Sequence, residues 1–479
     1  MKKHMVRFGK LEFIAFVSGA VLMMFELAAA RILAPSIGSS TYVWTSVIGV
    51  IIAALSIGYW SGGRIADARK KPADVVILCF FACVSVVFVL LSYVSILEWV
   101  VGAADDARLQ GMLASLILFA PTSFLLGVLS PYLAKFAVTS LDSTGSSIAN
   151  LSSLNSIGGI VGTFLTGFVL FGYIGSRETL GIVALMLLVC SWLLIPNWRW
   201  MWRVGASFVI VVAVGLPVQV AAGLHIDTPS AHYVIYEDWD PSEPQSTRGI
   251  ASGPTGIQSG IYVNQPDKLL FWYTKQLAQL VEAAPNKQNI LILGGGTFTL
   301  PQYLANKYPS SMIDVVEIDP TLESIAKKYF EYKSPSNVTL HFADARSFIN
   351  ESSKRYDVVI VDIYNDTSVP FSLMTREYGE AINRLLTVNG VVGVNMIAGQ
   401  QGACRELLQA LDVPYRRHLP QVTYSEDKKQ TVRANMVVAY SQQPVQWTGA
   451  NTLSLPKGVS YSDNFAPAER FQQACIDES

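Results

Sequence analysis

Charged residues are scarce in this 479-residue chain, where Asp, Glu, Lys and Arg together make up 15%. The mean hydropathy is +0.36, which is high for a soluble protein of this size. The formal net charge is -1, so the chain lacks the basic excess of nucleic-acid-binding proteins and we expect no nucleic-acid partner. Its 5 cysteines do not have the spacing of a metal site, and we expect no metal.

The lack of charge is concentrated before about residue 223. Seven apolar runs in this part reach the roughly 20 residues that a helix needs to cross a bilayer. They cover about residues 12–34, 42–62, 75–97, 111–134, 151–173, 179–196 and 204–222. The pattern predicts a polytopic α-helical membrane domain over residues 1–223, with about seven spans in the lipid bilayer of a cell membrane.

Basic residues collect before the first run, between the second and third, and between the sixth and seventh. Because Lys and Arg are retained on the cytoplasmic side, the amino terminus is expected to be cytoplasmic. Seven spans would then place the carboxyl-terminal domain on the opposite side of the membrane, whereas a run that is re-entrant or does not cross would leave it on the cytoplasmic side. The side of this domain therefore stays open.

Four ionisable residues and one glycine-rich run stand out in the membrane half. Glu26 and Arg31 lie in or near the first run, where charge is costly, and either pair within the bundle or serve transport. Arg64 and Asp67 are expected to pair across a glycine-rich turn after the second run. Small residues in the run 151–173 predict a helix-packing seam, with a substrate path as the alternative.

From residue 224 the pattern changes. Residues 224–265 predict a small β region, with strands at Tyr233–Tyr236 and Ile261–Val263 and a turn-rich stretch between them at 238–256. Residues 266–479 then begin with a helix from Asp267 and continue as alternating strands and helices. The strands are expected at 290–293, 313–317, 338–342, 358–361 and 390–396. Apolar strands that alternate with helices predict an α/β Rossmann-like domain with a parallel sheet.

Glycines and acids follow the ends of these strands. Gly294, Gly295 and Gly296 follow the first strand, where backbone amides can contact a ligand. Glu317 ends the second strand, about twenty residues later, where an acid can bind the hydroxyls of a ribose. The next acids are Asp319, which helps to turn the chain into the following helix, Asp344 after the third strand and Asp362 after the fourth. Acids at successive strand ends predict a nucleotide-type site.

Four segments in this order resemble the successive motifs of the spermidine synthases, which are polyamine aminopropyltransferases. The segments are Ile290–Gly296, Val315–Pro320, Phe342–Ala345 and Tyr356–Asp362. Gly256–Ser259 and Thr375–Glu377 resemble flanking motifs, and the similarity covers roughly residues 230–400. With its apolar first half, the chain resembles the membrane-fused branch of this family. The resemblance implies a class I methyltransferase-type Rossmann-like fold.

The resemblance also implies a reaction. Decarboxylated S-adenosylmethionine would lie across the strand ends as the co-substrate, with Glu317 on its ribose and Asp344 and Ala345 by its adenine. Putrescine or a related polyamine would lie beyond it, beside Gln258 and with Asp366 as the candidate second acid. Asp362 matches the catalytic aspartate that takes a proton from the attacking amine, and the product would be spermidine. A homo-oligomer is implied as well.

The sequence departs from the family pattern at two places. Thr297, Phe298 and Thr299 stand where the family has an acid and two glycines, and Asn365 stands where it has a second aspartate. The change around Thr297 could fit a donor that retains its carboxylate, which is one alternative: an S-adenosylmethionine-dependent methyltransferase with another acceptor. Glu26, Arg31 and the glycine-rich fifth run motivate the other alternative, a non-catalytic polyamine or nucleoside sensor, or a transport-linked module.

Two cysteines, Cys404 and Cys475, occur in the soluble half. Their separation allows either a disulfide bond, which would favour an external domain, or two buried thiols.

Overall fold

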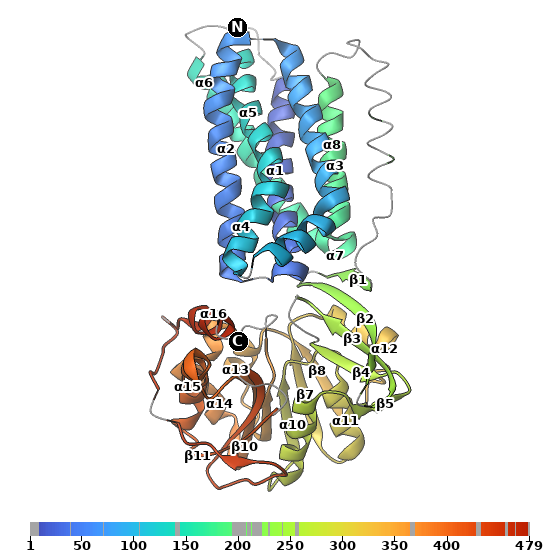
Figure 1. Cartoon of the computed structure of the whole chain (residues 1–479), viewed down its shortest axis with the longest axis vertical. Helices are drawn as coiled ribbons and strands as arrows, with labels where there is room; N and C mark the ends of the chain where they lie inside the picture. The colour runs from blue at the N-terminus through green and yellow to red at the C-terminus, as the bar shows by residue number, and fades with distance from the viewer. Residues whose placement is uncertain are drawn as a thin grey trace. The chain divides into compact units, whose positions relative to one another are not determined.

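The computed structural model describes residues 9–38, 40–69, 71–104, 106–138, 144–193, 207, 212, 223–228, 230–241, 243–253, 258–364, 369–427, 433–455, 458–464 and 466–477. The chain divides into two compact units, Met1–Tyr233 and Val234–Ser479, whose elements are labelled in Figure 1.

The first unit is a helical bundle. Its helices are α1 (Lys10–Ile37), α2 (Thr41–Arg69), α3 (Pro72–Ala103), α4 (Ala107–Leu118), α5 (Ala120–Ala137), α6 (Thr144–Leu165), η2 (Thr166–Leu170), α7 (Phe171–Tyr173) and α8 (Gly175–Leu193). Five helices in the described part of the chain are long and apolar enough to cross a membrane, and six when α4 and α5 count as one span bent by 53°.

Six of the seven predicted spans are therefore confirmed as apolar helices. The fourth is broken at Phe119, next to Pro121 in the first turn of α5, because proline has no amide to continue the helical hydrogen bonds. The predicted seventh span, 204–222, lies outside the described residues except for Ser207 and Val212.

Glycine seams hold the bundle together. A Cβ atom on Gly19 would lie 1.9 Å from the carbonyl oxygen of Asn155, and one on Gly158 would lie 1.9 Å from that of Phe16. These contacts bring the backbones of α1 and α6 together, as small residues do between membrane helices. The glycine-rich fifth run is thus a packing seam.

Three of the charged residues singled out in this unit, Arg31, Arg64 and Asp67, have specific partners. Arg31 Nη1 donates to the carbonyl oxygen of Thr228 at 2.5 Å. The predicted glycine-rich turn is wrong, because α2 continues as a helix through this segment, and the predicted Arg64–Asp67 pair is replaced by other contacts of the two residues. Asp67 instead pairs with Lys135 at the end of α5 at 2.5 Å, and the Arg64 guanidinium lies over the Trp60 ring.

A small antiparallel sheet follows the helical bundle in the chain, and its strands from Val234 onward belong to the second unit. After β1 (Leu224–Asp227), the strands β2 (His232–Asp240), β3 (Gln245–Ala251), β4 (Ser259–Tyr262) and β5 (Gln265–Leu269) pair in chain order. Two predictions were wrong here. The stretch 238–256 contains β3 rather than only turns, and the helix expected from Asp267 begins at Trp272, because residues 265–269 pair with β4.

The larger sheet has the order β13-β11-β12-β10-β9-β6-β7-β8. Its strands are β6 (Asn289–Leu293), β7 (Met312–Glu317), β8 (Val338–Phe342), β9 (Tyr356–Val361), β10 (Leu386–Ala398), β11 (Gln421–Glu426), β12 (Ala434–Ser441) and β13 (Asn451–Thr452). The neighbouring strands β8, β7, β6, β9 and β10 are parallel, as predicted. Strands β12, β11 and β13 extend the sheet beyond β10 in antiparallel pairs. The chain leaves β6 towards β7 and later returns to β9 on the other side, so the switch point lies between β6 and β9.

Helices alternate with these strands. They are α10 (Trp272–Ala283), α11 (Thr299–Lys307), α12 (Thr321–Tyr329), α13 (Ala345–Glu351), η3 (Phe371–Leu373), α14 (Arg376–Arg384), α15 (Gly402–Arg416) and α16 (Ala468–Asp477). Of these, α10 lies against β10 and β12, α11 against β7 and β8, and α15 against β10. The fold is thus the expected Rossmann-like α/β domain. Cys404 and Cys475 form a disulfide that joins α15 to α16, so the disulfide alternative is the one that the structure contains.

Candidate active site

The glycine loop after β6 lies directly against the chain that leaves β9. Gly294 has φ +96°, and a Cβ atom there would lie 2.0 Å from the carbonyl oxygen of Asp362. The Asp362 amide in turn donates to the carbonyl oxygen of Leu293 at 2.8 Å. Only glycine combines this backbone conformation with so close an approach. The two predicted features, the glycine run and Asp362, therefore meet at the switch point.

Glu317 lies beneath the glycine loop and is 9% exposed. Its Oε2 accepts the amides of Gly295 and Gly296 at 2.9 and 3.1 Å. Its Oε1 accepts the amides of Ile318 and Asp319 at 2.8 and 3.1 Å. Burial raises the pKa of Glu317 above its usual range, although these amide hydrogen bonds oppose the rise. The acid at the end of β7 is thus fixed against the loop that would approach a nucleoside.

The two other predicted nucleoside acids cap helices. Asp319 is buried, and its Oδ1 accepts the amide and the hydroxyl of Thr321 at 2.9 and 2.5 Å, at the start of α12. Asp344 is exposed and accepts the amide of Ser347 at 2.9 Å, which caps α13. Ala345 is the first residue of that helix. Both carboxylates orient the helix N-termini that follow β7 and β8, and their contact with a ligand stays a prediction.

Asp362 is held from two sides. Its Oδ1 accepts the side-chain amide of Asn395 at 2.9 Å, and the Tyr273 hydroxyl also hydrogen-bonds to its carboxylate. Burial raises the pKa of Asp362 to about 6. The hydrogen bonds from Asn395 and Tyr273 oppose this rise, and the negative charge of Glu317 adds to it. Such a carboxylate is ionised at pH 7 and accepts a proton readily.

Sequence reasoning missed both partners of Asp362. The sequence places Tyr273 in the helix expected from Asp267 and Asn395 in the strand expected at 390–396, without a role in the site for either residue. A usable signal was present for Asn395, because it is the one amide in the otherwise apolar run 391–397. Uncompensated polar groups are costly in a buried strand. No comparable signal marked Tyr273.

Gln258, which is predicted to lie beside the bound polyamine, is next to Tyr273. The Tyr273 hydroxyl is 3.3 Å from the carbonyl oxygen of Gln258, to which it can also donate. The Gln258 side chain donates to the Ser252 hydroxyl. Gln258 is therefore close to the partner of the predicted base. Asp366 and Asn365 lie outside the described residues.

Two neutral hydroxyl side chains pair at Thr297, where the sequence begins to depart from the family pattern. The Thr297 and Ser259 hydroxyls are 2.6 Å apart, and Thr297 is fully buried. Phe298, also fully buried, has φ +58° and packs its ring 5.0 Å from that of Tyr332. No carboxylate stands at these positions to balance a cationic ligand. In the described part of the chain, no three His, Cys, Asp or Glu side chains are arranged to hold a metal ion.

Comparison with known proteins shows a family model, "Spermine/spermidine synthase domain", that matches residues 270–429. A polyamine aminopropyltransferase of Vibrio vulnificus (strain CMCP6) is 34% identical over 143 residues, which are 29% of this chain and 48% of that protein. A probable polyamine aminopropyl transferase of Bifidobacterium longum (strain NCC 2705) is 35% identical over 157 residues, 32% of this chain and 34% of that protein.

Putrescine N-methyltransferase 2 of Nicotiana attenuata is 35% identical over 130 residues, 26% of this chain and 34% of that protein. The chain thus spans about half or less of the length of these relatives. The matched residues contain the glycine loop, Glu317, Asp362 and Asn395, the arrangement described above. Residues 270–429 are a spermine/spermidine synthase domain, preceded in this chain by an apolar helical region.

Proposed function

We propose that this protein is a membrane-anchored aminopropyltransferase. It would transfer an aminopropyl group from decarboxylated S-adenosylmethionine to putrescine or a related polyamine, giving spermidine from putrescine. The observation that carries the proposal is Asp362, with its pKa of about 6, at the switch point beside the glycine loop. A group that is ionised at pH 7 but close to titration is suited to general-base catalysis.

The need for a base follows from the chemistry of the acceptor. Amines of this kind have pKa values near 10, and an ammonium has no lone pair with which to attack carbon. Asp362 would take the proton from the attacking amine. Decarboxylated S-adenosylmethionine supplies a carbon activated by its sulfonium. The new C–N bond forms at this carbon as the C–S bond breaks, and the electron pair leaves on the sulfur of methylthioadenosine.

The remaining residues would bind and orient the two substrates. Glu317 would accept the ribose hydroxyls, and Asp344 and Ala345 would lie by the adenine. Gln258, next to Tyr273, would line the amine side. Two features of the site support nucleoside binding. Gly294 lets the loop lie directly against the backbone of Asp362, and the Glu317 carboxylate is already held at the mouth of β7.

One observation favours a second candidate, methyl transfer from S-adenosylmethionine to an amine. Thr297 is neutral, buried and hydrogen-bonded to Ser259, so it offers no counter-charge to the free ammonium of the decarboxylated donor. A donor that retains its carboxylate brings its own counter-charge. Relatives of this chain include putrescine N-methyltransferases.

A product assay on the purified full-length protein tests both candidates. Each donor is incubated with putrescine at pH 7.5, and the products are identified by mass spectrometry. Spermidine with methylthioadenosine is expected, at a rate that Asp362→Asn lowers by roughly 100-fold or more, since a positioned base contributes about 10²–10⁴.

Three other results would contradict aminopropyl transfer in different ways. N-methylputrescine with S-adenosylhomocysteine would establish the second candidate. Putrescine binding without either product would favour a polyamine sensor. A parent protein no more active than Asp362→Asn with either donor would exclude both reactions.

A further inference from the structure

Strand β10 extends beyond the end of its parallel neighbour, β9. Its parallel pairing with β9 ends at Val394, opposite Val361, whereas its antiparallel pairing with β12 continues to Ala398. Residues 395–397 therefore have a backbone edge without a strand partner. The chain that leaves β9, residues 362–364, runs along this edge and carries Asp362.

The Tyr364 side chain fills the place of the missing strand. Its hydroxyl donates to the carbonyl oxygen of Asn395 at 2.9 Å and accepts the amide of Ile397 at 2.8 Å. These two backbone groups face the same edge of β10, so one hydroxyl satisfies both. A buried backbone group left unpaired would destabilise the folded state. Tyr364 thus connects the segment that follows Asp362 to β10, which is paired with β12 at this point.

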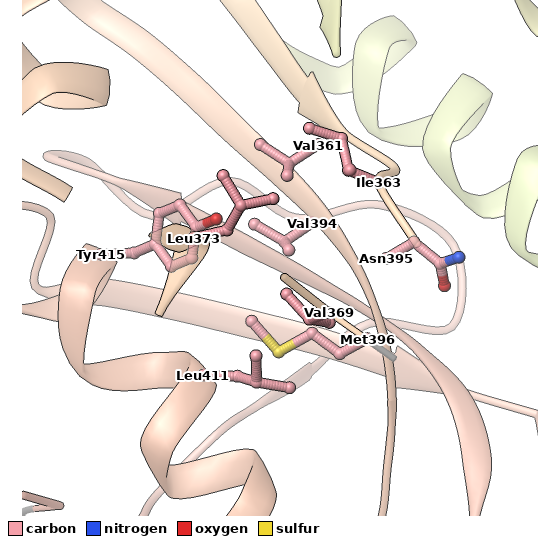
Figure 2. A pocket seen from close by; sticks show the side chains of 9 residues that line it. All are labelled: Val361, Ile363, Val369, Leu373, Val394, Asn395, Met396, Leu411 and Tyr415. Carbon is pink, nitrogen blue, oxygen red and sulfur yellow. The ribbon is translucent and has the colours of Figure 1, made fainter. Parts of the chain in front are cut away.

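Asn395 supplies the third bond of this connection. Its side chain is 5% exposed and donates to Asp362 Oδ1 at 2.9 Å. Asn395 lines an apolar cavity of about 10 Å³ together with its strand neighbours Val394 and Met396, and Figure 2 shows its side chain pointing away from theirs. Alternate residues of a strand face opposite sides of the sheet. Asn395 therefore lies on the face of Gly393, where a Cβ would contact Leu280 of α10.

In the Asn395 side-chain amide, the nitrogen donates a hydrogen bond to Asp362, whereas the oxygen is left without one in the described part of the chain. Its Oδ1 is buried without a hydrogen-bond partner among the described residues. Turning the amide over would bring this oxygen against the Asp362 carboxylate, and two acceptors repel. The orientation with the N–H group on the carboxylate is therefore the favoured one. An unsatisfied buried oxygen is unfavourable for packing, so packing does not account for Asn395.

We propose that Tyr364 and Asn395 are positioning residues for Asp362. Tyr364 fixes the backbone that carries the carboxylate, and Asn395 fixes the carboxylate itself. The proposal rests on the proposed function of Asp362 as the general base. It adds that the geometry of the base depends on how far β10 extends past β9, through two side chains that hold Asp362 and take no proton from the substrate themselves.

The two residues are expected to act differently on the base. Asn395 stabilises the ionised form of Asp362, so its removal raises the pKa of that carboxyl. The other titratable groups that face Asp362 are Tyr273, Tyr364 and Glu317, and they remain in place. Tyr364 acts on the backbone. Its removal lowers the fraction of molecules with a correctly placed carboxylate and leaves the pKa of Asp362 nearly unchanged.

The pH dependence of kcat separates these effects from a general loss of structure. Asn395→Ala is expected to move the acidic limb of the profile upward by about one pH unit, the size expected for losing a hydrogen bond to a charged group. Asn395→Gln, which keeps the amide, is expected to restore part of this shift. Tyr364→Phe is expected to lower kcat about tenfold, with the acidic limb and the KM for the donor unchanged.

Each variant has a matched control on the same sheet. Asn389→Ala removes an exposed asparagine of β10. Tyr424→Phe removes a hydroxyl on β11 that accepts a hydrogen bond from the side chain of Gln400 at 2.9 Å. Both controls are expected to keep the parent profile. An acidic limb that is the same for Asn395→Ala and the parent would overturn the role of Asn395, and an unchanged kcat for Tyr364→Phe would overturn that of Tyr364.

A measurement without turnover separates this inference from the proposed function. Thermal melting of the full chain is compared for the parent, Asn395→Ala, Asp362→Asn and the double variant. Asn395 and Asp362 are expected to be coupled at pH 7.5 and much less at pH 4, where the carboxyl is protonated. Coupling in a protein that makes no product would uphold the contact and reject the reaction. Turnover without coupling would reject the contact and uphold the reaction.

Discussion

Asp362 has opposite effects on activity and on stability as pH changes. Its pKa in the folded protein is raised to about 6 from 3.8, so the folded state binds this proton more tightly than the unfolded state. Its contribution to stability is therefore fully present below about pH 4 and is lost as the pH rises through 6. Activity requires the ionised form and is expected to rise over the same interval.

The variant Asp362→Asn tests the stability half of this statement. Above pH 7 it is expected to melt at a higher temperature than the parent, because it removes a buried charge. At pH 4 the two proteins are expected to melt at similar temperatures, since the carboxyl is then neutral in both. Melting curves of the purified protein at pH 4 and 7.5 provide the measurement. A lower melting temperature of the variant at pH 7.5 would contradict the raised pKa.

Residues at strand ends could be predicted from the sequence, whereas their partners could not. The order of strands and helices sets where Gly294, Glu317 and Asp362 lie, because parallel strands end at one edge of a sheet. The contact of Asn395 with Asp362 instead depends on how far β10 extends past β9. The length of β10 past β9 reflects its pairing with β12. This pairing joins segments that are distant in the sequence, so no local pattern in either segment reveals it.

At the scale of elements, the parallel core could be predicted and the antiparallel additions could not. Strands β6, β7 and β9 are short apolar runs buried on both faces, which local sequence reveals. Strand β3 contains Gln245, Ser246 and Arg248 and resembles a turn by composition. It forms a strand because β2 and β4 pair with it on both sides. Tertiary pairing overrides local preference at such positions.

The seam between α1 and α6 gives a prediction for the helical bundle. Gly158→Ala places a methyl group where only 1.9 Å separates it from the Phe16 carbonyl oxygen. It is expected to destabilise the bundle by about 1–3 kcal/mol, as overpacking does. Gly167→Ala is the matched control, since a Cβ there meets nothing within 4 Å.

The cysteines of the chain provide a selective readout for this comparison. Cys79, Cys83 and Cys190 are buried thiols of the bundle, while the cysteines of the second unit are in a disulfide. A thiol-reactive fluorescent dye therefore reports unfolding of the bundle during heating. Gly158→Ala is expected to react at a lower temperature than Gly167→Ala. Equal reaction temperatures would contradict a close seam.

The disulfide between α15 and α16 stabilises the carboxyl-terminal segment. It closes a loop with a sequence separation of 71, for which a loss of about 4 kcal/mol is expected on removal. The segment also contacts the region after Asp362. Gln472 of α16 donates to the carbonyl oxygen of Val369 at 3.3 Å, and the Thr375 hydroxyl donates to Asp463 at 2.6 Å.

The double variant Cys404→Ser/Cys475→Ser is therefore expected to unfold at lower denaturant concentration and to lose activity together with stability. Tryptophan fluorescence during urea titration gives the stability, and the product assay gives the activity. Addition of a reductant is expected to destabilise the parent and to leave the variant unchanged. A variant as stable as the oxidised parent would show that α16 is held by packing alone.

At the scale of the whole molecule, the sequence and the disulfide bear on the side of the membrane that the second unit occupies. Basic residues predict a cytoplasmic amino terminus, and seven apolar runs would carry the next domain to the other side. A buried disulfide is typical of an oxidising compartment. Decarboxylated S-adenosylmethionine, however, is a cytoplasmic metabolite, so an external domain would not meet that donor pool.

We predict that the carboxyl terminus lies outside the cytoplasm. Alkaline phosphatase, active only outside, and a green fluorescent protein, fluorescent only inside, are each fused to the carboxyl terminus. Phosphatase activity without fluorescence is expected, and deletion of residues 204–222 is expected to reverse both signals because it removes one crossing. Fluorescence from the undeleted protein would contradict the prediction and remove the conflict with a cytoplasmic donor. An external terminus in a protein that makes spermidine in the product assay would instead require that the donor reach the site from outside.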